Sequence, residues 1–191
     1  MYTVCAGIDV VFHAAALKQV PSAELYPLEA VNTNIIGSHN LVRAAIERGV
    51  KHVVAISTDK AVKPVNAMGM TKALQEKIML SEDLEKDRTT FCCVRYGNVL
   101  GSRGSVIPEF LKQRKTGKLQ VTDLNMTRFN ITLDESVDFV LWVLSNALGG
   151  EIFVSKIPSM KVVDITKTIS SKAKIKYIGI RPGEKIHENT L

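Results

Sequence analysis

Short apolar runs alternate with amphipathic segments along the chain. Helical periodicity covers residues 27–49 and 66–86, with Gly49 at the expected C-terminal stop. The apolar runs have the unbroken hydrophobicity of parallel strands buried on both faces, and they lie at residues 9–16, 52–57 and 89–96. Helices that separate such strands predict strand–helix–strand units with right-handed crossovers.

The second half of the chain repeats this alternation with shorter segments. It predicts helices at residues 106–116, 134–147 and 162–172, and strands at residues 119–122, 152–155 and 175–180. No internal repeat or low-complexity linker interrupts the series. The expected fold is therefore of the α/β class, with a doubly wound parallel sheet.

Composition narrows the classes of function. With 46% hydrophobic and 23% charged residues, the 191-residue chain is expected to be ordered and globular. The net charge of +6 is spread among acidic residues without an aromatic and basic platform, so no nucleic-acid partner is predicted. Neither a long apolar window nor a signal-peptide pattern is present, which predicts a cytoplasmic protein without a membrane partner.

Cysteine and histidine usage adds no metal site. The three cysteines are expected to be reduced core thiols, because they show no C-x-x-C spacing and two of them lie in an apolar run. The four histidines are scattered and lack the pairing on one helix face that zinc sites use.

Polar and glycine-rich residues follow the predicted strands. Ligands of open α/β sheets bind beyond the C-terminal ends of the strands, so these residues are the expected site. The segments are "HAAALKQ", "STDKAVKP", "RYGNVLGSRGS" and, further along, "IRPGEK".

The segment "STDK" holds the candidate chemistry. Thr58, Asp59 and Lys60 place a hydroxyl, a carboxyl and an amine side by side after a strand. Met68 and Lys72 are four residues apart and share a face of the next helix. A methionine thioether has no proton to lose and is a weak acceptor, so Met68 cannot act as a base.

These motifs resemble a known family. A serine at a strand end followed by a residue-x-x-x-Lys pair is similar to the extended short-chain dehydrogenases/reductases, whose usual pair is Tyr-x-x-x-Lys. "STDK" with "NAMGMTK" resembles the CapD-like nucleotide-sugar 4,6-dehydratases of polysaccharide biosynthesis. Four further motifs match that group in order over nearly the whole chain: "HAAALKQVP", "RYGNVLGSRGSVIP", "TRFNITLDESVD" and "RPGEK".

The resemblance implies a partial Rossmann-type domain. Residues 1–100 correspond to the C-terminal half of the dinucleotide-binding domain, and residues 101–191 to a smaller portion that adds substrate-binding elements and the remaining sheet. The Gly-rich phosphate loop of the family is absent, and "IDVVFHAAA" matches what is normally the fourth strand. Roughly 70 residues are thus expected to be missing at the front. A remnant without catalysis, which binds nucleotide sugar or a partner chain, is the alternative.

The implied activity is a 5-inverting UDP-N-acetylglucosamine 4,6-dehydration. Hydride leaves sugar C4, water is lost across C5 and C6, and hydride returns to C6, with NADP as the expected cofactor and NAD as the other possibility. UDP-N-acetylglucosamine or a related UDP-sugar is the expected partner, and the full-length protein is expected to be a homo-oligomer. A UDP-sugar 4-epimerase is the alternative enzyme, although its chemistry uses the tyrosine and not "DK".

The resemblance also assigns catalytic roles. Lys60 would be the base at C5, and Asp59 the acid for the departing C6 hydroxyl. Deprotonation of the C4 hydroxyl would fall to Asp59, to Thr58 through a water, or to the field of Lys72. Met68 would be a feature of the subgroup, with a degenerate copy that has lost its tyrosine as the alternative.

Binding roles come from the same resemblance. The candidate cofactor residues are Ala14, Ala15, Ala16, Asn34, Ser57, Lys72 and Tyr96. The candidate substrate residues are Lys18, Asn98, Arg103, Arg128, Arg181 and Glu184. Arginine suits a pyrophosphate because its donors form a planar fork. Ordinary core alanines and surface arginines are the alternative readings of these positions.

Overall fold

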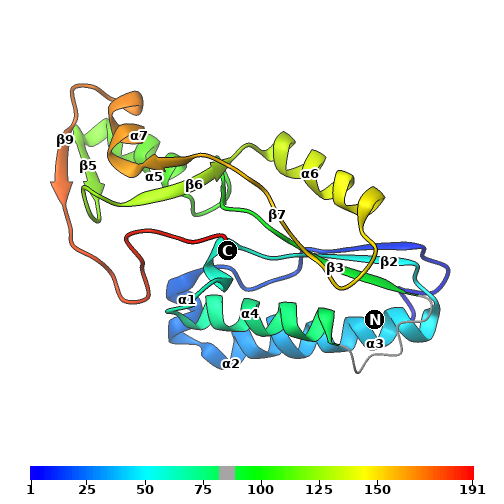
Figure 1. Cartoon of the computed structure of the whole chain (residues 1–191). Helices are drawn as coiled ribbons and strands as arrows, with labels where there is room; N and C mark the ends of the chain where they lie inside the picture. The colour runs from blue at the N-terminus through cyan, green and yellow to red at the C-terminus, as the bar shows by residue number, and fades with distance from the viewer. Residues whose placement is uncertain (82–88) are drawn as a thin grey trace.

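Four parallel strands form the central sheet of the computed structural model, which describes residues 1–81 and 89–191 (Figure 1). In spatial order they are β1 (Val10–His13), β2 (His52–Ile56), β3 (Thr90–Arg95) and β7 (Ile152–Val154). Val53 of β2 pairs with Val11 on one side and Phe91 on the other. Because all four strands run in one direction, their carboxyl ends meet at one edge, as the sequence predicted.

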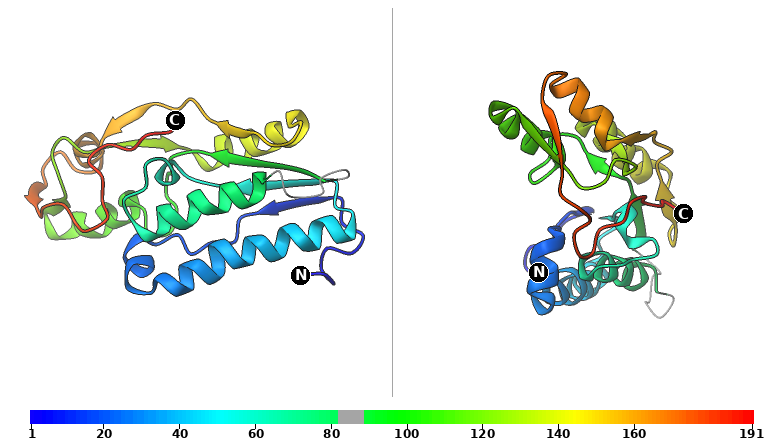
Figure 2. Two further views of the ribbon diagram at one scale, coloured as in Figure 1. Left: turned by 60° about the horizontal axis from the view of Figure 1, so that its bottom comes forward. Right: turned by 90° about the vertical axis from the view of Figure 1, so that its left-hand side faces the viewer.

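Helices cover both faces of this sheet. Helices α3 (Gly37–Arg48) and α4 (Ala67–Leu80) lie on one face, and α6 (Leu133–Asn146) lies on the other (Figures 1 and 2). The predicted doubly wound α/β arrangement is therefore confirmed.

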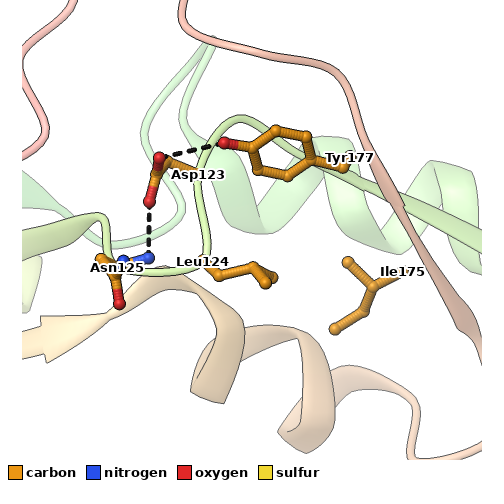
Figure 3. Close-up of a pocket in the computed structure, with 5 residues that line it drawn as sticks. All are labelled: Asp123, Leu124, Asn125, Ile175 and Tyr177. Carbon is orange, nitrogen blue, oxygen red and sulfur yellow. Dashed lines mark hydrogen bonds between the residues drawn. The ribbon is translucent and has the colours of Figure 1, made fainter.

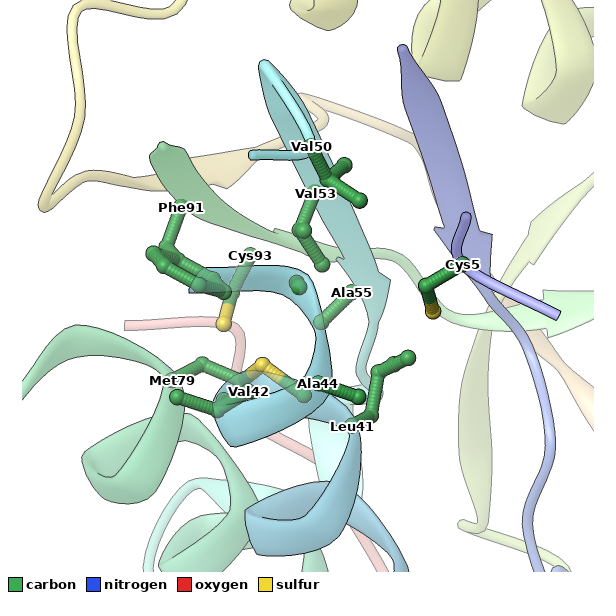
Figure 4. Close-up of a cluster of buried hydrophobic side chains, with 11 residues drawn as sticks. Cys5, Leu41, Val42, Ala44, Val50, Val53, Ala55, Met79, Phe91 and Cys93 are labelled. Carbon is green, nitrogen blue, oxygen red and sulfur yellow. The ribbon is translucent and has the colours of Figure 1, made fainter. Parts of the chain in front are cut away.

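Alternation along the strands builds a core on each face. Val53 and Ala55 point toward α3 and pack with a cluster that includes Leu41, Val42 and Phe91 (Figure 4). Val54, between them in sequence, packs with a second cluster that includes Val143 of α6. Successive strand side chains point to opposite faces, which is why an unbroken apolar run is needed here.

A smaller region lies beyond the carboxyl edge of the sheet. Strands β5 (Lys118–Val121) and β9 (Lys174–Tyr177) pair in parallel, and α5 (Val106–Gln113) and α7 (Val162–Ile169) pack against them around Phe110. A second small sheet has the order β4-β6-β8, with β4 (Asn98–Val99), β6 (Thr127–Ile131) and β8 (Ser159–Lys161).

Several predicted boundaries were wrong. The segment predicted as one helix over 27–49 consists of α2 (Pro27–Ala30), a π-helical segment η1 (Val31–Ile36) and α3. Gly49 ends α3 in the left-handed conformation, with φ 68°, as predicted. Helix α4 ends at Leu80, and the rest of the predicted 66–86 helix beyond Ser81 lies outside the described residues.

Other elements were not predicted at all. They are α1 (Val20–Leu25), the 3-10 turn η2 (Asp59–Ala61) and strands β4, β6 and β8. The helix predicted over 106–116 ends in the 3-10 turn η3 (Arg114–Thr116). Strands β4 and β8, of two and three residues, are too short to show a period, and Pro21 and Pro27 interrupt the helical pattern at the first helices. The strand predicted over 9–16 stops at His13.

The three cysteines lie in the interior with free thiols, as predicted. Burial raises the pKa of Cys92 to about 11 and raises the pKa of Cys93 as well. Within the described ranges, no helix has both the length and the apolar character needed to cross a membrane.

Candidate active site

The 3-10 turn η2 places Asp59 and Lys60 directly after strand β2. Thr58 caps this turn, because its Oγ1 accepts a hydrogen bond from the Lys60 backbone N–H at 3.3 Å. The Asp59 backbone N–H donates to the Tyr96 carbonyl, 3.2 Å away at the end of the neighbouring strand β3. The turn is therefore fixed at the carboxyl edge of the sheet, where the sequence predicted the site.

The Asp59 carboxylate is fully buried. Its Oδ1 accepts from Thr58 Oγ1 and from Lys60 Nζ, each at 2.9 Å, and Lys60 Nζ also donates to Asn98 Oδ1 at 3.1 Å. Its Oδ2 is buried and accepts no hydrogen bond from the described residues. A buried polar atom without a partner is costly, so this oxygen is left for a group that the chain does not supply.

Helix α4 approaches the turn at a glycine. A Cβ on Gly69 would lie 2.4 Å from the Lys60 carbonyl oxygen, so no other residue fits without a shift of the backbone. Asn66 caps the helix, with its Oδ1 accepting from the Gly69 N–H at 2.7 Å and its Nδ2 donating to the Gly183 carbonyl at 2.7 Å. The start of α4 is thus tied to η2 and to the C-terminal segment.

Lys72 reaches from α4 to the end of β2. Its Nζ donates to the Ile56 carbonyl at 2.6 Å and to Gln75 Oε1, and the residue is 6% exposed. Burial lowers its pKa to about 8, although Glu76 and Cys93 act in the opposite direction. An ammonium has three donors, and those two bonds use two of them. One donor remains for a further acceptor.

A buried histidine lies near Lys72. His13 Nε2 is 2.9 Å from Ser38 Oγ, and the Ser38 hydroxyl donates to the Asn34 carbonyl at 2.7 Å. Burial, assisted by the charge of Lys72, lowers the His13 pKa to about 4. His13 is therefore neutral near pH 7 and contributes no second cation.

Met68 lies in an apolar cluster. It is 4% exposed and packs with Ala23 and Ala30, and with the half-buried Leu17 and Val20. No polar role is visible for its thioether. The Met68 side chain thus fills a packing position at the start of α4.

Asn34 ties the loop after β1 to helix α4. Its Oδ1 accepts from the Leu17 N–H at 2.8 Å, and its Nδ2 donates to the Leu17 carbonyl at 3.1 Å and to Thr71 Oγ1 at 3.0 Å. The π-helical segment η1 presents this side chain, and π-helical turns often occur at functional sites. All of these bonds are to protein atoms, so Asn34 positions the loop.

Two other predicted cofactor residues also have protein partners. Ser57 Oγ donates to Glu76 Oε1 at 2.5 Å, and Arg95 binds the same carboxylate through two donors at 2.7 and 2.6 Å. The Tyr96 side chain packs in the cluster below α6, where burial raises its pKa. Both side chains point into the protein.

The predicted alanines lie after the end of β1. Ala14 and Ala15 are exposed, and Ala16 is half-buried. Lys18 and Arg103 are exposed as well. Gly104, next to Arg103, meets the Gln19 side chain, since a Cβ there would lie 2.6 Å from Gln19 Nε2. The loops after β1 and β4 therefore touch at Gln19 and Gly104, the residues next to Lys18 and Arg103.

The C-terminal segment crosses from β9 back to the active-site turn (Figure 1). Arg128 of β6 donates to the Lys185 carbonyl at 2.9 Å and to the Ile186 carbonyl at 3.1 Å, so its guanidinium holds this segment. Arg181 pairs with Glu184 near the surface. The "RPGEK" motif is thus brought to the site, although these arginines have protein partners.

Sequence reasoning missed several residues of this site. Glu188 lies 3.9 Å from Lys60 Nζ, and Asn66 and Glu76 hold α4 and the strand ends. Asn66 carried a usable signal, because an asparagine before a helical pattern is a favoured N-cap. Glu76 follows Lys72 by four residues and so shares its helix face. Glu188 had no such local signal.

A separate hollow of about 440 Å³ lies in the smaller region (Figure 3). Its lining includes Asp123, whose Oδ2 accepts from the Tyr177 hydroxyl at 3.0 Å and whose Oδ1 accepts from the Asn125 N–H at 2.7 Å. None of the predicted site residues lines it.

Residues 1–191 match the polysaccharide biosynthesis protein family. The chain belongs to this family. One family relative is a protein of Rickettsia bellii (strain RML369-C) named UDP-glucose 4-epimerase, 50% identical over 192 residues, which cover 97% of this chain and 56% of that protein. The chain therefore spans about half the length of the curated relatives that it matches.

Solved structures agree with the fold. Pen from Bacillus thuringiensis is 41% identical with a TM-score of 0.94, over 100% of this chain and 63% of that one. DesIV from Streptomyces venezuelae, a dTDP-glucose 4,6-dehydratase solved with NAD bound, is 19% identical with a TM-score of 0.85, over 97% of this chain and 65% of that one. The latter similarity concerns the fold alone.

Proposed function

We propose that the protein carrying this chain is a nucleotide-sugar 4,6-dehydratase that acts on UDP-N-acetylglucosamine or a related UDP-sugar and inverts C5. The observation that carries the proposal is the buried Asp59 carboxyl, which bonds Lys60 through Oδ1 and leaves Oδ2 without a partner among the described residues. A paired acid and base at one strand end suit the removal of a proton and a hydroxyl from adjacent carbons.

The two side chains divide the elimination between them. Once C4 is a ketone, the C5–H bond becomes acidic, and the neutral amine of Lys60 takes the C5 proton. Asp59, in its protonated form, gives its proton to the C6 hydroxyl, which leaves as water while the C5–C6 double bond forms. A proton from solvent then adds to the opposite face of C5 and inverts that centre, and Lys60 releases the first C5 proton to solvent. Geometry supports this division because the two groups lie within 2.9 Å of each other.

Removal of the C4 hydroxyl proton needs another group, since Met68 cannot accept it. Thr58 Oγ1 donates to Asp59 Oδ1 at 2.9 Å, which supports a relay that would carry the C4 hydroxyl proton through Thr58 to Asp59. The positive charge of Lys72 favours the developing alkoxide.

The residues present fit a nicotinamide cofactor. When bound, it supplies hydride acceptance at C4 and hydride return at C6. Lys72 has one donor left for a ribose hydroxyl, and Ala14 to Ala16 allow close approach of the cofactor at the strand end. Three further residues hold the surroundings of the proposed cofactor site in place. Asn34 bonds the loop after β1, Ser57 bonds Glu76, and Tyr96 packs below α6. We propose NADP from the family resemblance, with NAD as the other candidate because DesIV was solved with NAD.

Substrate recognition is proposed for the remaining polar residues. Lys18 and Arg103 are exposed on adjoining loops and suit the pyrophosphate. Asn98 lies beside Lys60 and suits the sugar. Arg128, Arg181 and Glu184 shape the C-terminal segment that borders this space. We further propose that the full-length protein is a homo-oligomer and that residue 100 marks the boundary between the two portions.

A UDP-sugar 4-epimerase is the second candidate, favoured by the name of the Rickettsia bellii relative. Epimerisation changes only C4, so it has no use for an acid at C6 or a base at C5. The Asp59–Lys60 pair therefore favours dehydration.

Incubation of the full-length protein with UDP-N-acetylglucosamine and NADP in deuterated water, followed by NMR of the sugar, tests the proposal. We expect a 4-keto, 6-methyl product with deuterium at an inverted C5. Asp59→Asn and Lys60→Met are expected to lower its rate by about 10²-fold or more. A C4 epimer with an intact C6 hydroxyl would instead support the epimerase and contradict the dehydratase.

A further inference from the structure

Four charged side chains of alternating sign lie in a row at the site. Asp59 is 2.9 Å from Lys60, Lys60 is 3.9 Å from Glu188, and Glu188 is 3.3 Å from Lys185. Their side chains are 0%, 19%, 4% and 13% exposed in that order. Charges that are this deeply buried are only weakly screened by solvent, so each charge interacts strongly with its neighbours in the row.

Glu188 is held in place by groups other than Lys60. Lys185, which pairs with it, donates to the Val62 carbonyl at 2.7 Å, one residue after the η2 turn. The backbone around Glu188 is fixed to β6, because the Thr127 N–H donates to the Ile186 carbonyl at 3.1 Å and Thr127 Oγ1 lies 2.8 Å from His187 Nδ1. The ion pair with Lys185 and the anchored backbone therefore place the carboxylate near Lys60, and its Oε2 accepts no hydrogen bond from the described residues.

Lys60 needs such a partner because its own stem is flexible. A lysine amine is carried on a flexible four-carbon chain. A catalytic base must lie within hydrogen-bonding distance of the substrate proton that it removes. Asp59 and Asn98 bind Lys60 Nζ through hydrogen bonds at 2.9 and 3.1 Å. Glu188 Oε1, at 3.9 Å, is too far for a hydrogen bond but close enough to attract the protonated form of Lys60, from which the neutral amine that acts as the base is formed.

We propose that Glu188 is a positioning residue that holds the Lys60 amine in place for its reaction at the sugar. This inference rests on the proposed function of Lys60 as the base. Asp59 would otherwise be the sole carboxylate beside Lys60 among the described residues, and its attraction would draw the amine toward the acid. Glu188 balances that attraction, and the C-terminal segment thereby completes the site.

Steady-state kinetics of the full-length protein with UDP-N-acetylglucosamine tests this role. Glu188→Gln keeps the shape and removes the charge, and we expect kcat to fall by about 10- to 100-fold with KM changed by less than about 2-fold, as for a misplaced catalytic group. Glu188→Asp, which keeps the charge, should recover part of that loss. Glu109→Gln removes an exposed carboxylate from α5 and is the matched control.

A folded Glu188→Gln protein with wild-type kcat would overturn the proposal, as would a loss that appears only in KM. If Glu188→Gln does not fold, Glu188→Asp decides, because a withdrawn carboxylate should still lower kcat, and an unchanged kcat overturns the role.

NMR of the 191-residue chain gives a readout that needs no activity. The two Hε protons of Lys60, identified by their loss in Lys60→Met, should be inequivalent in the wild type and merge in Glu188→Gln as the side chain becomes mobile. If the wild-type enzyme makes no dehydrated sugar, the proposed function is contradicted, but the NMR test of the contact between Glu188 and Lys60 remains valid. Unchanged Hε signals would show that Glu188 does not hold Lys60.

Discussion

Burial sets the protonation of single residues around the site. Lys72 and His13 both have lowered pKa values, about 8 and about 4, because each is removed from water. His13 is neutral at pH 7, and Lys72 is still mostly charged there. Lys72 thus remains a cation of the site at neutral pH, only slightly below the pH at which it loses its proton.

The Lys72 shift predicts a pH dependence of stability. The folded-state pKa of about 8 lies below the ordinary 10.5, so the unfolded chain binds the proton more tightly, and the unfolding free energy should rise as pH increases from about 8 toward 10.5. Between pH 7 and pH 9.5 we expect the wild type to gain roughly 2 kcal/mol relative to Lys72→Met. Urea unfolding at several pH values measures this difference.

Lys77→Met, on the exposed side of the same helix, controls for the loss of a lysine. The opposite result is an unfolding free energy of the wild type relative to Lys72→Met that stays constant or falls from pH 7 to pH 9.5. That result would show that Lys72 is not desolvated in the folded protein.

At the level of elements, the contact between α4 and η2 depends on the absence of a side chain. Gly69 lets the first turn of α4 come close to the Lys60 carbonyl, and Asn66 caps that turn. Gly97, between Tyr96 and Asn98, plays a similar part, since a Cβ there would lie 2.3 Å from the Phe129 carbonyl oxygen. Close approach of backbones thus shapes the site from two sides.

Gly69→Ala is expected to destabilise the protein by about 1–3 kcal/mol, because the new methyl group must push apart two backbone segments that have no flexible end to yield. Urea denaturation measures the loss. Gly37→Ala is the matched control, since Gly37 is also helical but its Cβ would meet only the Asn32 carbonyl, at 3.4 Å. It should be neutral or stabilising by up to about 1 kcal/mol. Equal effects of the two substitutions would rule out the close approach as the cause.

At the scale of the whole molecule, the C-terminal segment joins the small region to the central sheet. Gly183, Lys185 and Glu188 reach Asn66, Val62 and Lys60, and Arg128 holds the segment from β6. The site therefore depends on the last part of the chain as much as on the strand ends.

Arg128→Lys should loosen this segment, because a lysine keeps the charge but cannot span the carbonyls of Lys185 and Ile186 with a planar fork. The amide of Thr127, which donates to the Ile186 carbonyl, should then exchange its hydrogen at least about 10-fold faster, since local opening becomes easier. Hydrogen exchange followed by NMR measures this. Arg114→Lys, in η3, is the control, and equal exchange in both variants would contradict the role of Arg128.

The sequence by itself determined the parallel sheet and the place of the proposed acid–base pair. Buried strands need unbroken apolar runs, and the polar residues that follow them lie at one edge, so Asp59 and Lys60 could be located from local pattern alone. The stop at Gly49 was readable for the same reason, since a left-handed helix end favours glycine. Strands as short as β4 and β8 carry too few residues for any period to show.

Only the tertiary structure decided which groups surround Lys60. Glu188 reaches it because β9 ends in the small region and the chain returns along β6, a path that no local pattern specifies. The same holds for Asn34 and Arg128. The family resemblance suggested that they contact ligands, but in the folded chain their donors bind backbone carbonyls. Side-chain type and spacing limit what a residue can bind, and the fold decides which partner comes within reach.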